Sequence, residues 1–461
     1  MGFVKLGIFS MLSGAMAAPP TVKETPVNKV GHQEGILQLS LFNVPLELEM
    51  GANNKTKRQI STELENYIYD GSGGAIKTLG IALEFGTPPQ KVIVEPDTAS
   101  DKLWIQRVPH GHQRSGSKST HFDEGASSSL HDLKRQDHIS YVSEVVPMDI
   151  FEDIVSIGGV SFGKTSFGIA NMTRKLASIS RNVGCMGLTT GKDVDTSILA
   201  KLQKKNLVKN RAFSMALRKK DQGALIFGAY DTSKFSGPLE KFAIQPGKNG
   251  LSYRSKQFIA KVQSLSFNSG GDRSQVLLND KTASSKPLTV GIDTGTPGLC
   301  ISRDYQSQIA EKMGATVKSD MLHVSCDVAE TKASLDFHMS NKTVISIPLS
   351  DFLMKRDDGK DCLLAIQFDP PGLLPADFWI GGHFLRRSLV VFDPDKSNLH
   401  IARGADCGST VVAMGDTIPE DVVGKCEQGT PEIDPQAEMA PTMKLTSEFI
   451  HSIMNPRLAK H

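Results

Sequence analysis

The strongest constraint on this sequence is a short motif that occurs twice. Asp293-Thr294-Gly295-Thr296 and, 196 residues earlier, Asp97-Thr98-Ala99-Ser100 each place an aspartate, a threonine and a small residue directly after a run of strand-forming residues. A small-residue turn at the end of a strand lets a carboxylate approach another backbone closely. Two such turns that face each other would bring two carboxylates together.

Two adjacent carboxylates do not both ionise easily, so they tend to share one proton. One of them can then act as a base toward water while the other acts as an acid toward a carbonyl. That is the chemistry of peptide hydrolysis without a covalent intermediate. A lone Asp-Thr-Gly is more often a plain turn, so this interpretation depends on the features that accompany the two copies.

Composition narrows the class of protein. A chain of 461 residues has room for two or three domains with sizeable cores. The net charge is +2, from 52 basic and 50 acidic residues without a basic stripe, which argues against a nucleic-acid partner. The 41 glycines and 23 prolines are scattered, as in a turn-rich β protein. The histidines between His110 and Leu130 lack a metal-ligand rhythm, so we expect an exposed loop there and no metal.

The N-terminal region has the pattern of a secretory signal followed by a pro-segment. Residues 1–17 end on Ala15-Met16-Ala17, an Ala-x-Ala cleavage site, although a disordered cytosolic N-terminus is the alternative. Residues 18–58 contain one amphipathic, strand-like run, Gly35 to Leu48. They end on Lys57-Arg58, which is either a dibasic processing site or solvated surface. Its position before the first clear strand pattern favours processing.

The rest of the chain gives further signs of secretion. No later run reaches the ~18 apolar residues that span a membrane, and the C-terminal end is polar and basic, so we expect no membrane anchor. Six cysteines fit an oxidising compartment, and three sequons, at Asn54, Asn171 and Asn341, are compatible with it. Residues 404–461 resemble an extension, and a local Cys407–Cys426 pair is one way to tie its start down.

Short strands dominate from Tyr67 onward. Ile76 to Phe85 and Lys91 to Val94 predict a hairpin around a Gly-Thr-Pro-Pro-Gln turn. A second hairpin is expected from Ile139 to Met148 and Ile150 to Ile157. Apolar spacing predicts a surface helix over Asp195 to Asn206.

The second half repeats this plan. Phe258 to Phe267 predicts a strand, Asn268 to Lys286 a polar loop, and Arg303 to Met313 a helix. Met186-Gly187-Leu188 and Trp379-Ile380-Gly381-Gly382 are glycine-punctuated apolar runs, each about 85 to 90 residues after its Asp-Thr turn. This internal duplication predicts two β lobes, residues 59–240 and 241–403, that each present one aspartate.

These motifs together resemble the pepsin-like aspartic proteases, most closely the secreted and yapsin-type enzymes of fungi. The similarity runs from about Ile76 to Arg403. The matching segments are Phe85-Gly86-Thr87-Pro88-Pro89-Gln90, Asp97-Thr98-x-Ser100 with Leu103-Trp104, Tyr141 with Asp153 and Ile157-Gly158-Gly159, Phe227-Gly228-Ala229-Tyr230-Asp231, Asp293-Thr294-Gly295-Thr296, Trp379-Ile380-Gly381-Gly382-x-Phe384-Leu385-Arg386, and Val390-Val391-Phe392-Asp393. The resemblance implies an all-β, bilobal fold with few short helices, an active-site cleft between two related lobes, and no cofactor.

The resemblance also implies roles for individual residues. Asp97 and Asp293 would hold and activate the water. The residues implied around them and the substrate are Thr98, Ser100, Trp104, Tyr141, Thr294, Gly295 and Thr296. The two threonines that follow the aspartates would brace the turns against each other, and Ser100 and Thr296 would bond the outer carboxylate oxygens. Tyr141 would be the flap tyrosine that closes over substrate, with Trp104 beneath it.

We expect two kinds of cysteine, disulfide-bonded and free. The resemblance implies a disulfide between Cys326 and Cys362 in the second lobe. Cys185 and Cys300 lie in apolar strand contexts, where a buried thiol is the more natural interpretation.

The sequence departs from the family pattern at four places. Ala99 replaces a glycine, Glu95-Pro96 replaces two apolar residues, and His383 replaces an aspartate. The flap tip, Val142-Ser143-Glu144, lacks the usual glycines. Alanine keeps its backbone N–H, but it would be strained if the turn needed a positive φ.

Our leading hypothesis is a secreted, acid-active aspartic endopeptidase made as a zymogen and working as a monomer on protein or peptide substrates. Its own propeptide would be its first partner. The departures make a slow enzyme the expectation. A pseudoprotease that binds peptides or inhibitors on the same fold is the alternative. A structural wall protein is disfavoured because the chain has no repeats or low-complexity stalk.

Overall fold

The computed structural model describes residues 31–33, 36–44, 78–107, 122–140, 145–157, 160–170, 184–190, 197–218, 223–248, 257–270, 274–283, 287–296, 298–318, 321–355 and 361–427. The predicted signal peptide, Lys57-Arg58 and the sequons at Asn54 and Asn171 lie outside these residues. The third sequon residue, Asn341, is exposed.

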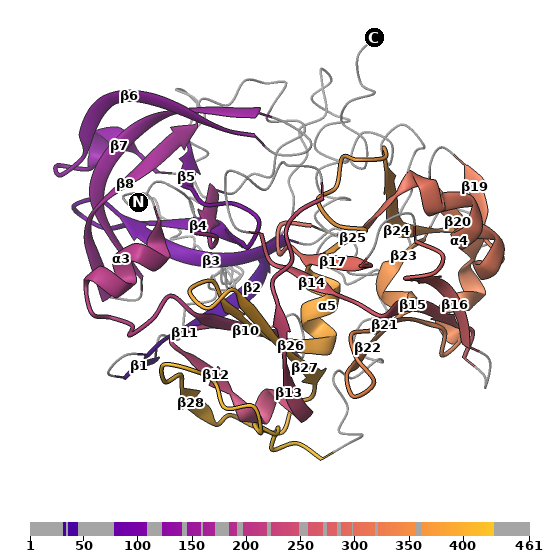
Figure 1. The fold of residues 1–461 in the computed structure, drawn as a ribbon. Helices are drawn as coiled ribbons and strands as arrows, with labels where there is room; N and C mark the ends of the chain where they lie inside the picture. Colours follow the sequence, from indigo (N-terminus) through magenta and orange to yellow (C-terminus); the bar gives the residue numbers. More distant parts are fainter. Residues whose placement is uncertain are drawn as a thin grey trace, which may run out of the picture.

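Two β lobes lie side by side, the first half of the chain in violet and the second in orange (Figure 1). Strands dominate both lobes, and the α-helices in the described residues are short: α3 (Ile198–Lys204), α4 (Gln306–Met313) and α5 (Gly382–Arg387). The sequence-based prediction of an all-β, bilobal, pepsin-like fold is confirmed.

Over the described residues the largest sheet has 14 strands. Its order is β13 (Phe235–Ala243), β27 (Asn398–Gly404), β26 (Ser388–Asp393), β10 (Phe213–Leu217), β11 (Gly223–Phe227), β2 (Ile36–Val44), β3 (Thr78–Phe85), β4 (Gln90–Asp97), β9 (Gly184–Gly187), β5 (Leu103–Gln106), β8 (Val160–Ala170), β7 (Val145–Ile157) and β6 (His131–Ser140), with β1 (Gly31–Gln33) paired to β2. One end of it, from β13 to β11 in this order, forms the base of the molecule, and the other end lies in the first lobe. Strands β26 and β27 come from late in the chain, so the base joins both halves.

The second lobe has two sheets of its own. The larger one contains β14 (Ile259–Lys261), β17 (Thr289–Ile292), β25 (Phe378–Ile380), β18 (Leu299–Ser302), β24 (Asp361–Asp369), β20 (Met321–Ser325) and β19 (Thr316–Lys318), with β23 (Leu353–Lys355) beside β24. The smaller one contains β16 (Ser274–Asn279), β15 (Ser264–Asn268), β21 (Ser334–His338) and β22 (Val344–Pro348). A buried cluster of aliphatic and aromatic residues continues from the first lobe into this one.

The two lobes repeat one arrangement of strands around their aspartates. In the first lobe β9 runs parallel to β4 and antiparallel to β5, and β5 is parallel to β8. In the second lobe β25 runs parallel to β17 and antiparallel to β18, and β18 is parallel to β24. The glycine-punctuated runs noted in the sequence form β9 and β25, so the internal duplication predicted from them is present.

Several predicted elements differ from the observed ones. The first arm of the flap hairpin is β6, residues 131–140, which starts eight residues before the predicted arm. Its side chains are mostly exposed, so the strand has no apolar alternation to detect. The expected strand over 258–267 is divided into β14 and β15, and the expected loop over 268–286 contains β16, which pairs with β15.

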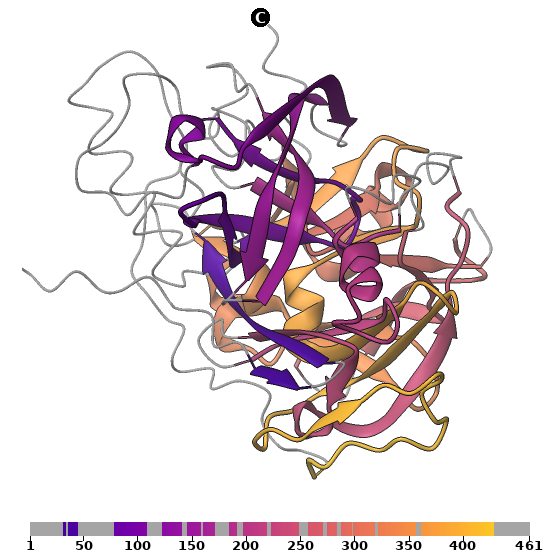
Figure 2. The same ribbon diagram turned by 90° about the vertical axis from the view of Figure 1, so that its left-hand side faces the viewer.

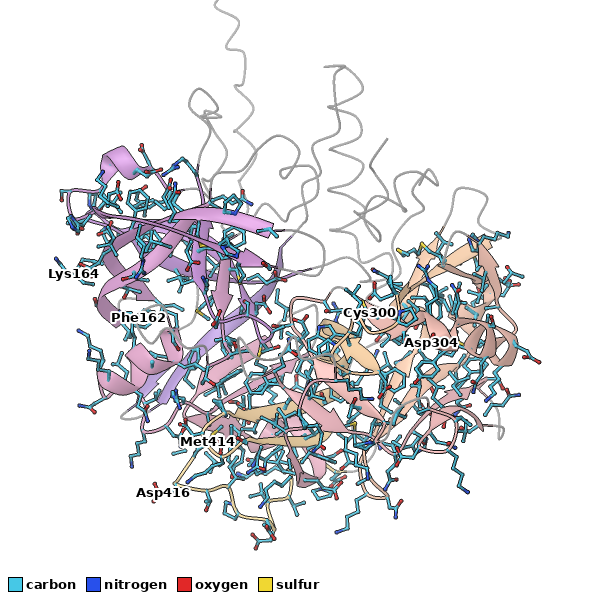
Figure 3. All side chains as sticks on the ribbon, turned by 45° about the horizontal axis from the view of Figure 1, so that its top comes forward. Phe162, Lys164, Cys300, Asp304, Met414 and Asp416 are labelled. Carbon is cyan, nitrogen blue, oxygen red and sulfur yellow. A yellow bond between two sulfur atoms is a disulfide. The ribbon has the colours of Figure 1, made fainter. Side chains whose placement is uncertain are left out.

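Both ends of the described chain are attached to the base. Strand β2, from the predicted propeptide, pairs with β11 on one side and with β3 on the other (Figure 2). Near the C-terminus, β28 (Val411–Ala413) pairs with β12 (Ala229–Asp231), and Cys407 and Cys426 form a disulfide. Met414 is buried against this base, whereas Asp416 is exposed (Figure 3).

Candidate active site

Strand ends deliver both aspartates to the junction of the lobes. Asp97 is the last residue of β4, and Asp293 directly follows β17. The backbone N–H of Leu188 donates to Asp97 O at 2.8 Å, and the N–H of Asp293 donates to Ile380 O at 2.8 Å, so the neighbouring strand fixes each turn. Both side chains are buried.

The two threonines join the turns across the junction, in the arrangement that the resemblance implied. Thr98 N donates to Thr294 Oγ1 at 2.9 Å, and Thr294 N donates to Thr98 Oγ1 at 3.0 Å. Each hydroxyl also donates to a backbone carbonyl of the opposite turn, at Ile292 O (2.9 Å) and Pro96 O (2.5 Å). Because these groups are buried and mutually satisfied, they hold the two aspartates in a fixed relation.

The inner carboxylate oxygens receive equivalent backbone donors. Ala99 N donates to Asp97 Oδ1 at 2.8 Å, and Gly295 N donates to Asp293 Oδ1 at 2.7 Å. Ala99 is not among the described residues with a positive φ, so the alanine is not strained. A Cβ on Gly295 would lie 3.0 Å from Asp293 Oδ1 and 3.2 Å from Asp97 Oδ1. The two inner oxygens therefore face one small shared space.

The outer oxygens are held differently in the two lobes. Asp293 Oδ2 accepts from Thr296 Oγ1 at 2.8 Å and from Trp379 Nε1 at 2.5 Å. Asp97 Oδ2 accepts from the Cys185 thiol at 3.7 Å, and the Ser100 hydroxyl lies 3.3 Å from that same sulfur. Thr296 thus takes the place the resemblance implied, whereas the described contact of Ser100 is with Cys185.

The electrostatics favour a retained proton. Burial and the neighbouring Asp97 carboxylate raise the pKa of Asp293 from 3.8 to about 7, although donors from Thr296, Trp379 and Gly295 lower it. A pair that holds a proton up to near-neutral pH can offer one acid and one base over a wide acidic range.

Trp104 lies in the first lobe, buried in a cluster with residues of the flap hairpin such as Ile139 and Val146. Tyr141 and the flap tip, residues 142–144, lie outside the described residues. His383 is buried in α5, and its ring packs against that of Phe352, with the ring centroids 4.7 Å apart.

Sequence reasoning missed three residues of the site: Glu95, Cys185 and Trp379. Glu95 is buried two residues before Asp97, so its side chain leaves β4 on the same face. Cys185 and Trp379 come from the neighbouring strands β9 and β25. The exchange of apolar residues for Glu95-Pro96 was the one sequence signal that pointed here.

The cysteines match their expected roles only in part. Cys326 and Cys362 form a disulfide. Cys185 is the buried free thiol that was expected, whereas Cys300 is free but only half-buried. Desolvation of its sulfur together with Asp369 and Asp293 raises the pKa of Cys300. Over the described ranges, no group of histidines, cysteines and acids is arranged to hold a metal. The helices in that part of the chain include none that is long and apolar enough to cross a membrane.

The pepsin-like aspartic proteases are defined by two related β lobes. Each lobe gives one aspartate to a shared site, and hydrogen bonds join the two aspartate turns. The sequence agrees: residues 80–404 match the profile of the eukaryotic aspartyl proteases. The chain therefore belongs to the eukaryotic aspartyl protease family, whose members hydrolyse peptide bonds.

Several fungal proteases are similar to this chain at low identity. It is 25% identical to candidapepsin of Candida tropicalis over 332 residues, which cover 69% of this chain and 77% of the relative. It is 26% identical to secreted aspartic protease 7 of Candida albicans over 355 residues, 70% of this chain and 59% of the relative. It is 28% identical to rhizopuspepsin-4 of Rhizopus niveus over 328 residues, 69% and 75% of the two chains.

Proposed function

We propose that this protein is a secreted aspartic endopeptidase that hydrolyses peptide bonds at acidic pH with Asp97 and Asp293 as its catalytic dyad. The observation that carries the proposal is that both inner oxygens border the same place beside Gly295, where a Cβ would lie 3.0 Å from Asp293 Oδ1 and 3.2 Å from Asp97 Oδ1. Two carboxyl groups this close to each other can both hydrogen-bond to one water molecule between them.

The chemistry follows from the protonation of the pair. With one proton on the two carboxyls, the ionised group takes a proton from the water as it attacks the peptide carbonyl. The protonated group donates to the carbonyl oxygen, so the two together act as base and acid. Thr98 and Thr294 keep the carboxyls in register, and Thr296 and Gly295 orient Asp293. Tyr141 and Trp104 are proposed to cover the substrate, and Ser100 to support Asp97 through Cys185.

The processing scheme is part of the proposal. Residues 1–17 would be the signal peptide, 18–58 the propeptide, 59–240 and 241–403 the two lobes, and 404–461 a C-terminal extension. The pairing of β2 with β3 and β11 supports an N-terminal segment that folds with the zymogen. Relatives named as secreted proteases support export. We expect a monomer without a membrane anchor or a nucleic-acid partner, acting on protein or peptide substrates.

The rate is a separate question. Val142 and Glu144 in a glycine-poor flap, and the buried Glu95 beside the dyad, lead us to propose a slow enzyme. A pseudoprotease on the same fold is the competing outcome.

Activity of the processed chain on a denatured protein, measured from about pH 3 to pH 8 with a pepstatin-type inhibitor as control, tests the proposal. We expect inhibitable cleavage with a bell-shaped profile whose alkaline limb lies near pH 7, because the last proton of the pair leaves there. Asp97→Asn and Asp293→Asn should each abolish cleavage and keep the circular dichroism spectrum. Binding of the inhibitor without cleavage would instead identify a pseudoprotease.

A further inference from the structure

The lobes place equivalent rows of side chains beside their aspartates. In the second lobe, β17 and β25 pair Gly291 with Trp379, and β25 and β18 pair Trp379 with Cys300. Asp293 follows Gly291 by two residues and so leaves the strand on the same face. A long side chain at the middle position of this row can reach the aspartate diagonally.

Gly291 creates the room for the Trp379 ring. A Cβ on Gly291 would lie 1.9 Å from Trp379 Cζ3 and 2.0 Å from Cε3, inside any permissible contact. Because no side chain fills this position, the indole lies over the β17 backbone. The ring is buried with Ile259, Leu374 and Ala376, and Ala99 of the first lobe packs against the same cluster.

The N–H edge of the indole contacts the carboxylate of Asp293. Its Nε1 donates to Asp293 Oδ2, the oxygen that also accepts from Thr296. The equivalent middle position of the first lobe is Cys185, which β9 pairs with Glu95 and with Trp104. A thiol is a weaker donor than an indole N–H, so the two aspartates are held by unequal partners at equivalent places.

We propose that Trp379 is a positioning residue of the dyad, whose indole N–H fixes the orientation and the charge state of Asp293. The inference rests on the proposed function only for its kinetic consequence, because the hydrogen bond itself can be measured in an inactive protein. The other titratable groups on the strands around the dyad are Asp97 and Glu95 on β4, Cys185 on β9, which contacts Asp97, and Cys300 on β18, which interacts with Asp369 and Asp293.

Three variants remove or displace the N–H donor, and the first of them also keeps the shape of the ring. Site-specific replacement of Trp379 by 3-benzothienylalanine exchanges N–H for sulfur in the same shape, and Trp379→Phe removes the donor with standard genetics. Gly291→Ala should displace the indole without touching Trp379. Val290→Ala, whose side chain leaves the opposite face of β17 and is buried in the core, controls for lost stability alone.

A hydrogen bond to the ionised carboxylate favours ionisation, so its loss should move the alkaline limb of kcat/KM upward by about one pH unit. We expect this shift in the first three variants and not in Val290→Ala. An unshifted limb with a reduced kcat would overturn the proposal and leave Trp379 as packing alone.

A second readout does not need activity. The difference in fluorescence between the natural chain and Trp379→Phe should titrate with Asp293 and should lose that titration in Asp293→Asn. A titrating signal in a chain that does not cleave would contradict the proposed function and support this inference. Cleavage with no such titration would contradict the inference alone.

Discussion

Ala99 and Gly295 occupy equivalent turns, and only one of them has room for a side chain. Both donate a backbone N–H to an inner carboxylate oxygen, at 2.8 and 2.7 Å. The Ala99 methyl group packs toward the cluster that contains Trp379 and Leu374, in the opposite lobe. A methyl group on Gly295 would instead enter the space between the carboxyls.

These contacts predict unequal effects for opposite substitutions. Gly295→Ala should reduce kcat/KM by about a thousandfold or more, because the new Cβ makes tight contacts with both inner oxygens and displaces the carboxylates that hold the water. Ala99→Gly, which leaves the N–H donor intact, should change kcat/KM only a few-fold. Steady-state kinetics on one peptide substrate measures both. Equal losses in the two variants would show that the shared space is not where the chemistry occurs.

Glu95 should set the position of the pH profile. It leaves β4 on the same face as Asp97 and is buried, so its negative charge, when present, opposes ionisation of the pair. Removing that charge in Glu95→Gln favours the ionised pair, which should move the whole profile to lower pH by about one unit. The profile of kcat/KM against pH measures the shift.

Glu84→Gln is the matched control for this experiment. Glu84 lies on β3 opposite Lys91, at the far end of the hairpin from Asp97, and its carboxylate accepts from Ser156. This variant should leave the profile in place. A displaced profile in Glu84→Gln, or none in Glu95→Gln, would mean that Glu95 does not act electrostatically on the dyad.

At the scale of elements, Arg218 donates hydrogen bonds to the ends of several chain segments. It follows β10, is buried, and donates to the carbonyls of Leu385 (3.1 Å), Ser388 (3.1 Å) and Ala405 (2.9 Å). It also contacts the Lys234 carbonyl. These carbonyls lie at the end of α5, at the start of β26, beyond β27 and at the end of a 3-10 helix. A cation near the end of α5 also complements the helix dipole.

Arg218→Met should lower the free energy of unfolding by about 3 kcal/mol or more, because several buried carbonyls lose their donor at once. Chemical denaturation followed by tryptophan fluorescence measures the change. Arg403→Met is the control, since Arg403 is an exposed residue of β27 and its loss should change stability by about 0.5 kcal/mol or less. Similar losses of unfolding free energy in the two variants would show that Arg218 stabilises the protein no more than an exposed arginine does.

Features with a local sequence pattern could be predicted, whereas features that depend on contacts between distant segments could not. The Asp-Thr turns and the helix with buried Ile198, Leu199 and Leu202 have local patterns, and the family resemblance implied the bracing threonines; the structure contains each of them. Strand β6 was misplaced because its exposed side chains leave no alternation. Trp379 could not be assigned to the site, because its contact with Asp293, 86 residues away in the chain, depends on the register of β25 against β17.

At the scale of the whole molecule, the base is assembled from both ends of the chain. Strands β26 and β27 bring late residues between β10 and β13, and β2 brings predicted propeptide residues between β11 and β3. The disulfide between Cys407 and Cys426 and the β12–β28 pair attach the segment that follows. Among the strands that the structure describes, only β2 joins the first-lobe part of the sheet to the base.

This position of β2 predicts that the propeptide is needed for folding. Without it, β11 loses five paired residues and β3 loses three, which leaves two unpaired strand edges in the interior of a sheet. A chain expressed from residue 59 should therefore refold in much lower yield than one that begins at residue 18. Refolding yield, judged by circular dichroism and gel filtration, measures the effect.

Two further experiments test whether the pairing of β2, and not the length of the propeptide, is what refolding requires. Residues 18–58 supplied as a separate peptide should restore the refolding of the shortened chain, because the strand pairs through backbone hydrogen bonds that need no covalent link. Leu39→Pro in the full chain should reproduce the defect, since Leu39 pairs with Leu225 and proline lacks the N–H donor. Glu24→Pro, outside β2, should not. Efficient refolding of the shortened chain alone, or equal defects from both prolines, would contradict a templating role for β2.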